Sequence, residues 1–182
     1  MLNRLIRRRL DAFERDFKCD VSHMREVLAA SRRAFQRLAR VQAMDAYRQD
    51  VPVGPWYAAK LVATLHEDCG PCTQLVADMA LRDGVPPPVV RAVVAGREEA
   101  MGPEVLVGYR FARAVLAHHD SAGELRAEVS RRWGPRGLVS LAFGITTSRM
   151  YPTLKYALGH GHACRVVRIG DHGEPVTVRP AA

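Results

Sequence analysis

The sequence predicts an all-α fold, and three observations lead to this prediction. Apolar residues recur every three or four positions along most of the 182 residues, which is the spacing of amphipathic helices. Proline and glycine separate these segments at positions that suit helix starts and ends. Only the C-terminal tail has an extended, hairpin-like pattern. With 48% hydrophobic residues, the chain is long enough for one compact domain with a sizeable core.

The N-terminal region, residues 1–45, predicts two amphipathic helices. Residues 50–55 then predict a loop, because two prolines and a glycine break the pattern. The residues that recur at helical intervals are Leu2, Leu5, Ile6, Leu10, Phe13 and Phe17 in the first helix, and Met24, Val27, Leu28, Ser31, Phe35 and Leu38 in the second.

Two further helices flank a Cys-x-x-Cys motif. Residues 56–65 are rich in alanine with apolar side chains at helical spacing, and Pro55 suits the first turn of this helix. Pro71 suits the start of the next helix, which we expect to end near Gly84. A helix before the motif argues against a thioredoxin fold, in which the motif follows a β-strand.

The rest of the chain predicts more helices and a short hairpin. A helix follows the prolines at 86–88 and ends at Gly96, and another begins at Pro103. Ser121 and Glu124 form a capping-box pattern for a helix that reaches about residue 133. The last long helix covers 138–150 and is interrupted by Pro152, and residues 153–158 are compatible with its resumption.

In the tail, residues 165–169 and 176–179 flank a Gly-Asp-His-Gly turn sequence, which predicts a hairpin. We therefore expect one domain over residues 1–182, with an N-terminal helical extension at 1–45, a core at 55–158 and a tail at 165–179.

The net charge of +8 lies mainly at the N-terminus, since residues 1–40 hold 11 basic side chains against 5 acidic ones. Because they fall on the outer faces of amphipathic helices, we interpret them as solvated faces and not as a nucleic-acid or membrane site. No run of residues could span a bilayer or act as a signal peptide, so we expect a cytoplasmic protein. A reducing cytosol leaves catalytic or metal-binding roles for a close cysteine pair.

Cys69 and Cys72 form this pair in the segment Asp68-Cys69-Gly70-Pro71-Cys72-Thr73-Gln74. If Pro71 opens a helix, both sulfurs lie near the positive end of the helix dipole, which favours the reactive thiolate. The pair can then alternate between dithiol and disulfide. Two small residues packed in a helical core are the plainer alternative.

The helix, cysteine pair and second helix resemble the AhpD-like alkylhydroperoxidase and carboxymuconolactone decarboxylase superfamily. The resemblance is best over residues 59–94 and looser over 105–157, and the motif with the segment 152–159 looks like a bacterial branch of that superfamily. It implies a homo-oligomer that reduces a hydroperoxide or a disulfide without a cofactor. A dithiol reductant such as a lipoyl protein would supply the electrons.

The resemblance also implies that Cys72 attacks the peroxide and Cys69 resolves the product, whereas thioredoxin logic assigns them the other way. The family has a histidine and a glutamate in its proton relay where this chain has Val76 and Tyr57. Glu67 and His66 lie just upstream of Cys69, and we consider both as substitute proton carriers, with solvated helix-end roles as the alternative.

Three other readings remain beside this one. His160, His162 and Cys164 could complete a zinc site with the cysteine pair, although this spacing is not a common one and we predict no metal. Cys19 fits simple packing, and Lys155 and Tyr151, like Arg149, could line a pocket near the thiols. The alternative function is a noncatalytic, oligomeric redox-sensing or partner-binding protein.

Overall fold

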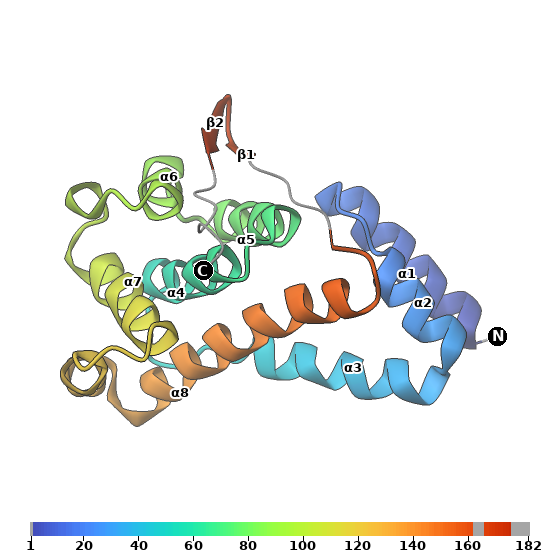
Figure 1. Ribbon diagram of the computed structural model, residues 1–182, viewed down its shortest axis with the longest axis horizontal. Helices are drawn as coiled ribbons and strands as arrows, with labels where there is room; N and C mark the ends of the chain where they lie inside the picture. The colour runs from blue at the N-terminus through green and yellow to red at the C-terminus, as the bar shows by residue number, and fades with distance from the viewer. Residues whose placement is uncertain (1, 162–165, 176–182) are drawn as a thin grey trace.

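The computed structural model describes residues 2–161 and 166–175, and it confirms the all-α prediction with a short C-terminal hairpin (Figure 1). No helix in these ranges is both long and apolar enough to cross a membrane. The elements are α1 (Leu2–Phe17), α2 (Ser22–Ala30), α3 (Arg32–Asp45), α4 (Val53–His66), α5 (Gly70–Arg82), α6 (Pro87–Ala95), a 3-10 turn (Glu98–Ala100), α7 (Pro103–Leu116), α8 (Ala122–Ala157), β1 (Val166–Ile169) and β2 (His172–Pro175).

Helix α4 is the centre of the core. All its residues from Pro55 to Thr64 are buried, and it packs against α5, α6, α7 and α8. Its small side chains let the neighbouring helices approach closely: a Cβ added at Gly108 of α7 would overlap the carbonyl of Pro55. Only glycine fits at this crossing. The close packing holds the cysteine motif, which follows α4 directly, against a rigid core.

The N-terminal region forms three helices, so the prediction of two was wrong. Ser31 has an extended backbone (φ −162°, ψ 117°) that separates α2 from α3. Its hydroxyl accepts a hydrogen bond from the backbone N–H of Ala34 at 3.2 Å and caps α3. The hydrophobic pattern continues across this break because Met24, Leu28 and Phe35 all pack into one small cluster.

Several contacts hold the N-terminal helices against the core. The guanidinium of Arg82 on α5 stacks on the ring of Phe17, 4.1 Å from its centroid, and donates to the carbonyl of Asp16. His160, just after α8, contacts the carboxylate of Glu26 at 2.6 Å. In Figure 1, α1 and α2 lie beside the C-terminal end of α8, and α3 runs along it.

Helix α8 confirms one prediction, a break after residue 133, and departs from two others, the capping box and the interruption at Pro152. Gly134 has a non-helical backbone (φ 65°, ψ −175°) and confirms the break expected after residue 133. The capping box does not form, because the Ser121 hydroxyl contacts Nδ1 of His119 at 2.8 Å instead of capping the helix. Pro152 does not interrupt the helix, which continues to Ala157. Proline removes one hydrogen bond but keeps a helical φ, and Pro152 is itself buried in the packed interface.

The hairpin is shorter than predicted within the described residues. Its strands pair antiparallel from Ile169 opposite His172 to Val166 opposite Pro175, so only Gly170 and Asp171 form the turn. A two-residue turn suffices because Gly170 adopts a positive φ of 62°. The predicted second-strand residues 176–179, like Arg165, lie outside the described residues. The side chain of Gln74 on α5 pairs with the backbone N–H and carbonyl of Arg168 and fixes β1 on the core.

Candidate functional site

The cysteine motif lies in the tight connection between α4 and α5. Asp68 adopts a positive φ of 52°, which turns the chain, and Cys69 is the N-cap residue of α5. Gly70 and Pro71 are the first two helical residues, so the expected place of Pro71 in the first turn is confirmed. The Cys69 carbonyl accepts hydrogen bonds from the N–H and the hydroxyl of Thr73 at 2.9 and 3.0 Å. The motif therefore wraps the positive end of the helix dipole.

The two thiols form a hydrogen-bonded pair with very different acidities. Both side chains are buried and free. The pKa of Cys69 is lowered to about 7, chiefly by a hydrogen bond from the Cys72 thiol and also by the Cys72 backbone N–H and the charge of Lys155, against the opposing effect of burial. The same hydrogen bond, together with burial, raises the pKa of Cys72 well above its ordinary value. The pair thus loses one proton near neutral pH and retains the other.

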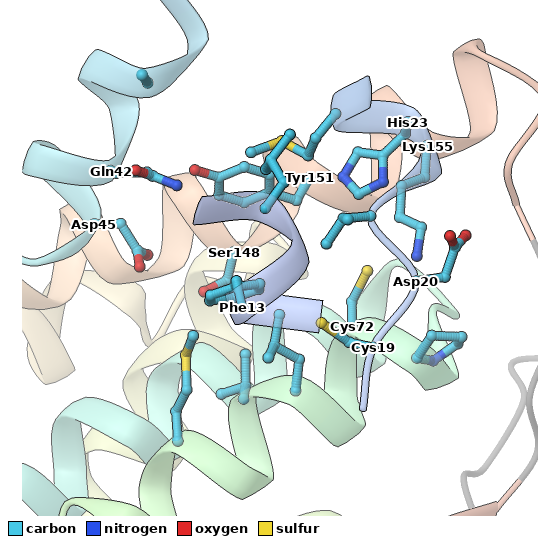
Figure 2. Close-up of a pocket in the computed structure, with 18 of the residues that line it drawn as sticks. Phe13, Cys19, Asp20, His23, Gln42, Asp45, Cys72, Ser148, Tyr151 and Lys155 are labelled. Atoms are coloured by element: carbon cyan, nitrogen blue, oxygen red, sulfur yellow. The ribbon is translucent and has the colours of Figure 1, made fainter. Parts of the chain in front are cut away.

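A cavity of about 530 Å³ lies between the N-terminal helices and helices α4, α5 and α8 (Figure 2). Cys72 lines it, whereas Cys69 does not. A molecule in the cavity therefore meets the sulfur of Cys72 first. Most of the wall is apolar, and the apolar lining residues are Ile6, Leu10, Phe13, Val21, Met24, Phe35, Ala39, Pro71, Leu75, Val76 and Met79.

A group of polar side chains surrounds Cys72 at one end of this cavity. Figure 2 shows Cys19, His23, Lys155 and Asp20 gathered there, with the Lys155 side chain directed toward the cysteines. Burial lowers the pKa of His23 to about 4, and the charge of Lys155 acts in the same direction, so the imidazole is neutral at physiological pH. Nδ1 of His23 is buried and has no hydrogen-bond partner among the described residues.

The other end of the cavity carries a satisfied ion pair. The ammonium group of Lys60 contacts the carboxylate of Asp45 at 2.9 Å and lies 4.3 Å from the ring centroid of Trp56. The hydroxyl of Thr147 donates to the same carboxylate at 2.6 Å. Tyr151, whose pKa burial raises to about 12, stays a neutral phenol there. The positive charge of Lys60 is therefore already paired with the carboxylate of Asp45.

The proposed proton carriers lie away from the cavity wall. The carboxylate of Glu67 accepts a hydrogen bond from the guanidinium of Arg149 at 2.5 Å and one from the hydroxyl of Thr153 at 3.4 Å. Neither Glu67 nor His66 lines the cavity. Arg149, considered as a pocket residue, serves this ion pair instead. The roles of Glu67 and His66 in proton transfer stay predictions, and the geometry gives them no path through the cavity.

Sequence reasoning placed some of the cavity residues and missed others. Lys155 and Tyr151 were considered as pocket residues, and both line the cavity. Val76, at the position of the family histidine, is an apolar part of the wall, and Tyr57 donates to Asp83 at 2.7 Å. His23 was missed because a single histidine in an amphipathic helix carries no signal of its own.

Cys19 was interpreted as packing, but it lines the same cavity as Cys72. Burial raises the pKa of Cys19. Cys69, whose pKa is lowered, is therefore the most acidic of the three thiols. The zinc reading involves His162 and Cys164, which lie outside the described residues. Within residues 2–161 and 166–175, no group of three or more metal-binding side chains is close enough to hold an ion.

Searches of protein-family models, of curated proteins and of solved structures found no match to this chain. The superfamily resemblance therefore rests on the cysteine motif and its flanking helices, and functional assignment rests on the geometry of the thiol pair and its cavity.

Proposed function

We propose that the protein is a thiol oxidoreductase in which Cys69 and Cys72 reduce a hydroperoxide or a disulfide and become a disulfide themselves. The observation that carries this proposal is the pairing of an acidic thiol with a second thiol that lines a cavity. A pKa of about 7 for Cys69 suits a general base at neutral pH. Two packed cysteines with no chemical role would need neither the acidity nor the cavity.

With a hydroperoxide, the roles divide between the two sulfurs. The Cys72 sulfur attacks the terminal peroxide oxygen while its proton passes to the Cys69 thiolate along their hydrogen bond. The O–O bond breaks, Cys69 passes the proton on to the leaving alkoxide, which becomes an alcohol, and Cys72 becomes a sulfenic acid. The Cys69 thiolate then attacks the Cys72 sulfur, the departing hydroxide takes a proton from solvent and leaves as water, and the disulfide forms. The cysteine pair loses two electrons and the peroxide gains them.

A dithiol reductant, for which a lipoyl protein is our candidate, returns the disulfide to the dithiol by thiol–disulfide exchange. This recycling needs a reducing compartment, so we place the protein in the cytoplasm. A homo-oligomeric state is part of the same proposal, and it rests on the superfamily resemblance alone.

The test measures hydroperoxide consumption with dihydrolipoamide as the reductant in the wild type and in Cys69→Ser, Cys72→Ser and Cys19→Ser. We expect turnover in the wild type and in Cys19→Ser, whose thiol lines the cavity but lies outside the pair. Cys72→Ser loses reaction with peroxide altogether. Cys69→Ser oxidises once, slowly, and does not turn over.

Mass spectrometry after trapping by alkylation gives the second readout, a Cys69 to Cys72 disulfide in the oxidised wild type. Wild-type turnover in either variant of the pair would overturn the proposal. One oxidation without turnover in the wild type would support the redox-sensing alternative in its place. A single slow oxidation of Cys69→Ser together with none of Cys72→Ser would confirm Cys72 as the attacking thiol.

A further inference from the structure

The cavity wall contains a largely buried lysine that forms no ion pair. Lys155 lies in the last turn of α8, has only 6% of its surface exposed, and lines the cavity beside Cys72. Its ammonium group makes no hydrogen bond or ion pair with any side chain in the part of the chain that the structure describes. The contrast with Lys60 is direct, since that buried ammonium has the carboxylate of Asp45. An unpaired buried charge is costly for a protein to keep.

None of the other charged groups of the cavity forms an ion pair with Lys155, although the charges of Asp20 and Lys155 act on each other. Asp20, at the same end, is exposed, and its Oδ1 accepts hydrogen bonds from the backbone N–H and the hydroxyl of Ser22 at 2.9 and 2.5 Å. Asp45 belongs to the ion pair at the far end. Arg9 adds a second positive charge at the exposed rim. The cavity thus offers one cation without a direct ion pair, near the charges of Asp20 and of the Cys69 thiolate, and this cation can bind an anion.

The rest of the cavity suits an apolar chain. Its walls come mainly from aliphatic and aromatic side chains of α1, α2, α3 and α5, and about 530 Å³ is in the range of small-molecule sites. Near Lys155 the neutral imidazole of His23 leaves a buried nitrogen without a partner, which can hydrogen-bond to a bound polar group. One charged end and an apolar body describe an amphipathic ligand.

We propose that the cavity binds an amphipathic carboxylate, with its anionic head on Lys155 and its alkyl chain along the apolar walls. This goes beyond the proposed function, because binding needs no redox step and can be measured without turnover. The head of such a ligand lies beside Cys72, so it covers the thiol that opens into the cavity. Ligand occupancy and access to the thiol pair are then mutually exclusive.

Isothermal titration with three ten-carbon probes tests the charge of the head group at constant chain length. The probes are decanoate, decanol and decyltrimethylammonium, each below its micelle-forming concentration. We expect the wild type to bind decanoate about tenfold more tightly than decanol, which is the value of one charge-assisted hydrogen bond. Decyltrimethylammonium, which places a cation against Lys155, should bind more weakly than decanol.

Two variants test whether the charge of Lys155 causes the preference for decanoate over decanol. Lys155→Met keeps the length of the side chain and removes the charge, so decanoate affinity should fall to that of decanol while decanol affinity is unchanged. Unchanged decanol binding also shows that the variant has kept its cavity. Asp20→Asn keeps the acceptor for Ser22 and removes the nearby negative charge, so it should tighten decanoate binding severalfold.

Alkylation supplies an independent readout in the wild type. Saturating decanoate should slow the reaction of Cys72 with iodoacetamide, and decanol at the same occupancy should slow it to a similar extent. Equal wild-type affinity for decanoate and decanol would overturn the inference, as would a decanoate preference that survives in Lys155→Met. If Lys155→Met does not fold, the three-probe series and Asp20→Asn decide the question. Binding without peroxide turnover would reject the proposed function and leave this site standing.

Discussion

The hydrogen bond between the two thiols should control the acidity of Cys69, and Cys72→Ala removes it. In the structure this bond is the main cause that lowers the pKa of Cys69 from 9.0 to about 7, while burial opposes the shift. Two pKa units correspond to about 3 kcal/mol in favour of the thiolate. At pH 7 they change the thiolate fraction from about one in a hundred to about one half, so the variant should have roughly fifty times less thiolate.

The pH dependence of Cys69 alkylation measures this directly, with peptide mass spectrometry to resolve the sites. The midpoint is compared between the two proteins, and not the rate, because the substitution also changes access to the sulfur. We expect a midpoint near pH 7 in the wild type and near pH 9 in Cys72→Ala. Cys19 serves as the internal control, since its raised pKa comes mainly from burial and should hardly change. A variant midpoint within half a unit of the wild-type one would refute the role of the thiol hydrogen bond.

Three further predictions concern stability, measured as the free energy of unfolding in urea. The wild type should gain up to about 3 kcal/mol between pH 7 and 9, because the unfolded thiol pair holds two protons there and the folded pair holds one, and Cys72→Ala should lose this gain. Asp45→Asn leaves the buried ammonium group of Lys60 without its carboxylate and should cost about 3 to 5 kcal/mol. Asp50→Asn removes the carboxylate of an exposed ion pair and should cost less than about 1 kcal/mol. Gly108→Ala should cost more than about 2 kcal/mol by forcing α7 away from α4, while Gly123→Ala, where an added Cβ meets nothing, should be close to neutral. Equal costs within either matched pair, or a flat pH profile, would contradict these assignments.

Local signals in the sequence were sufficient for most helix positions. Proline at a helix start and glycine after a helix end act through their own backbone geometry, so both ends of α6 and the start of α7 could be predicted well. The break at Ser31 could not, because the apolar spacing continues through it and the decisive feature is how α2 and α3 pack together. Pro152 gave the opposite error, since tertiary packing outweighs one lost hydrogen bond.

The thiol pair could be predicted from its motif, whereas the cavity could not. Spacing in the sequence places Cys69 and Cys72 on one helix start, which is a local arrangement. The neighbours of Cys72 come from distant segments: Cys19 and His23 precede it by about fifty residues, and Lys155 follows it by more than eighty. No periodicity within a single helix predicts that three such segments meet. The substitutes sought for the missing relay were therefore the adjacent Glu67 and His66, neither of which lines the cavity.

The position of the cavity follows from the division of the buried hydrophobic residues into two separate clusters. The core around α4 is one hydrophobic cluster with close helix crossings, such as that of Gly108 with Pro55. The N-terminal helices have a separate hydrophobic cluster, centred on Leu10, Met24 and Phe35. Where the two clusters face each other their side chains do not interdigitate fully, and the space that remains is the cavity that Cys72 lines. The basic N-terminal region, which the superfamily resemblance implies is an addition to the core, is thus one wall of the cavity, and its removal would open the cavity around Cys72.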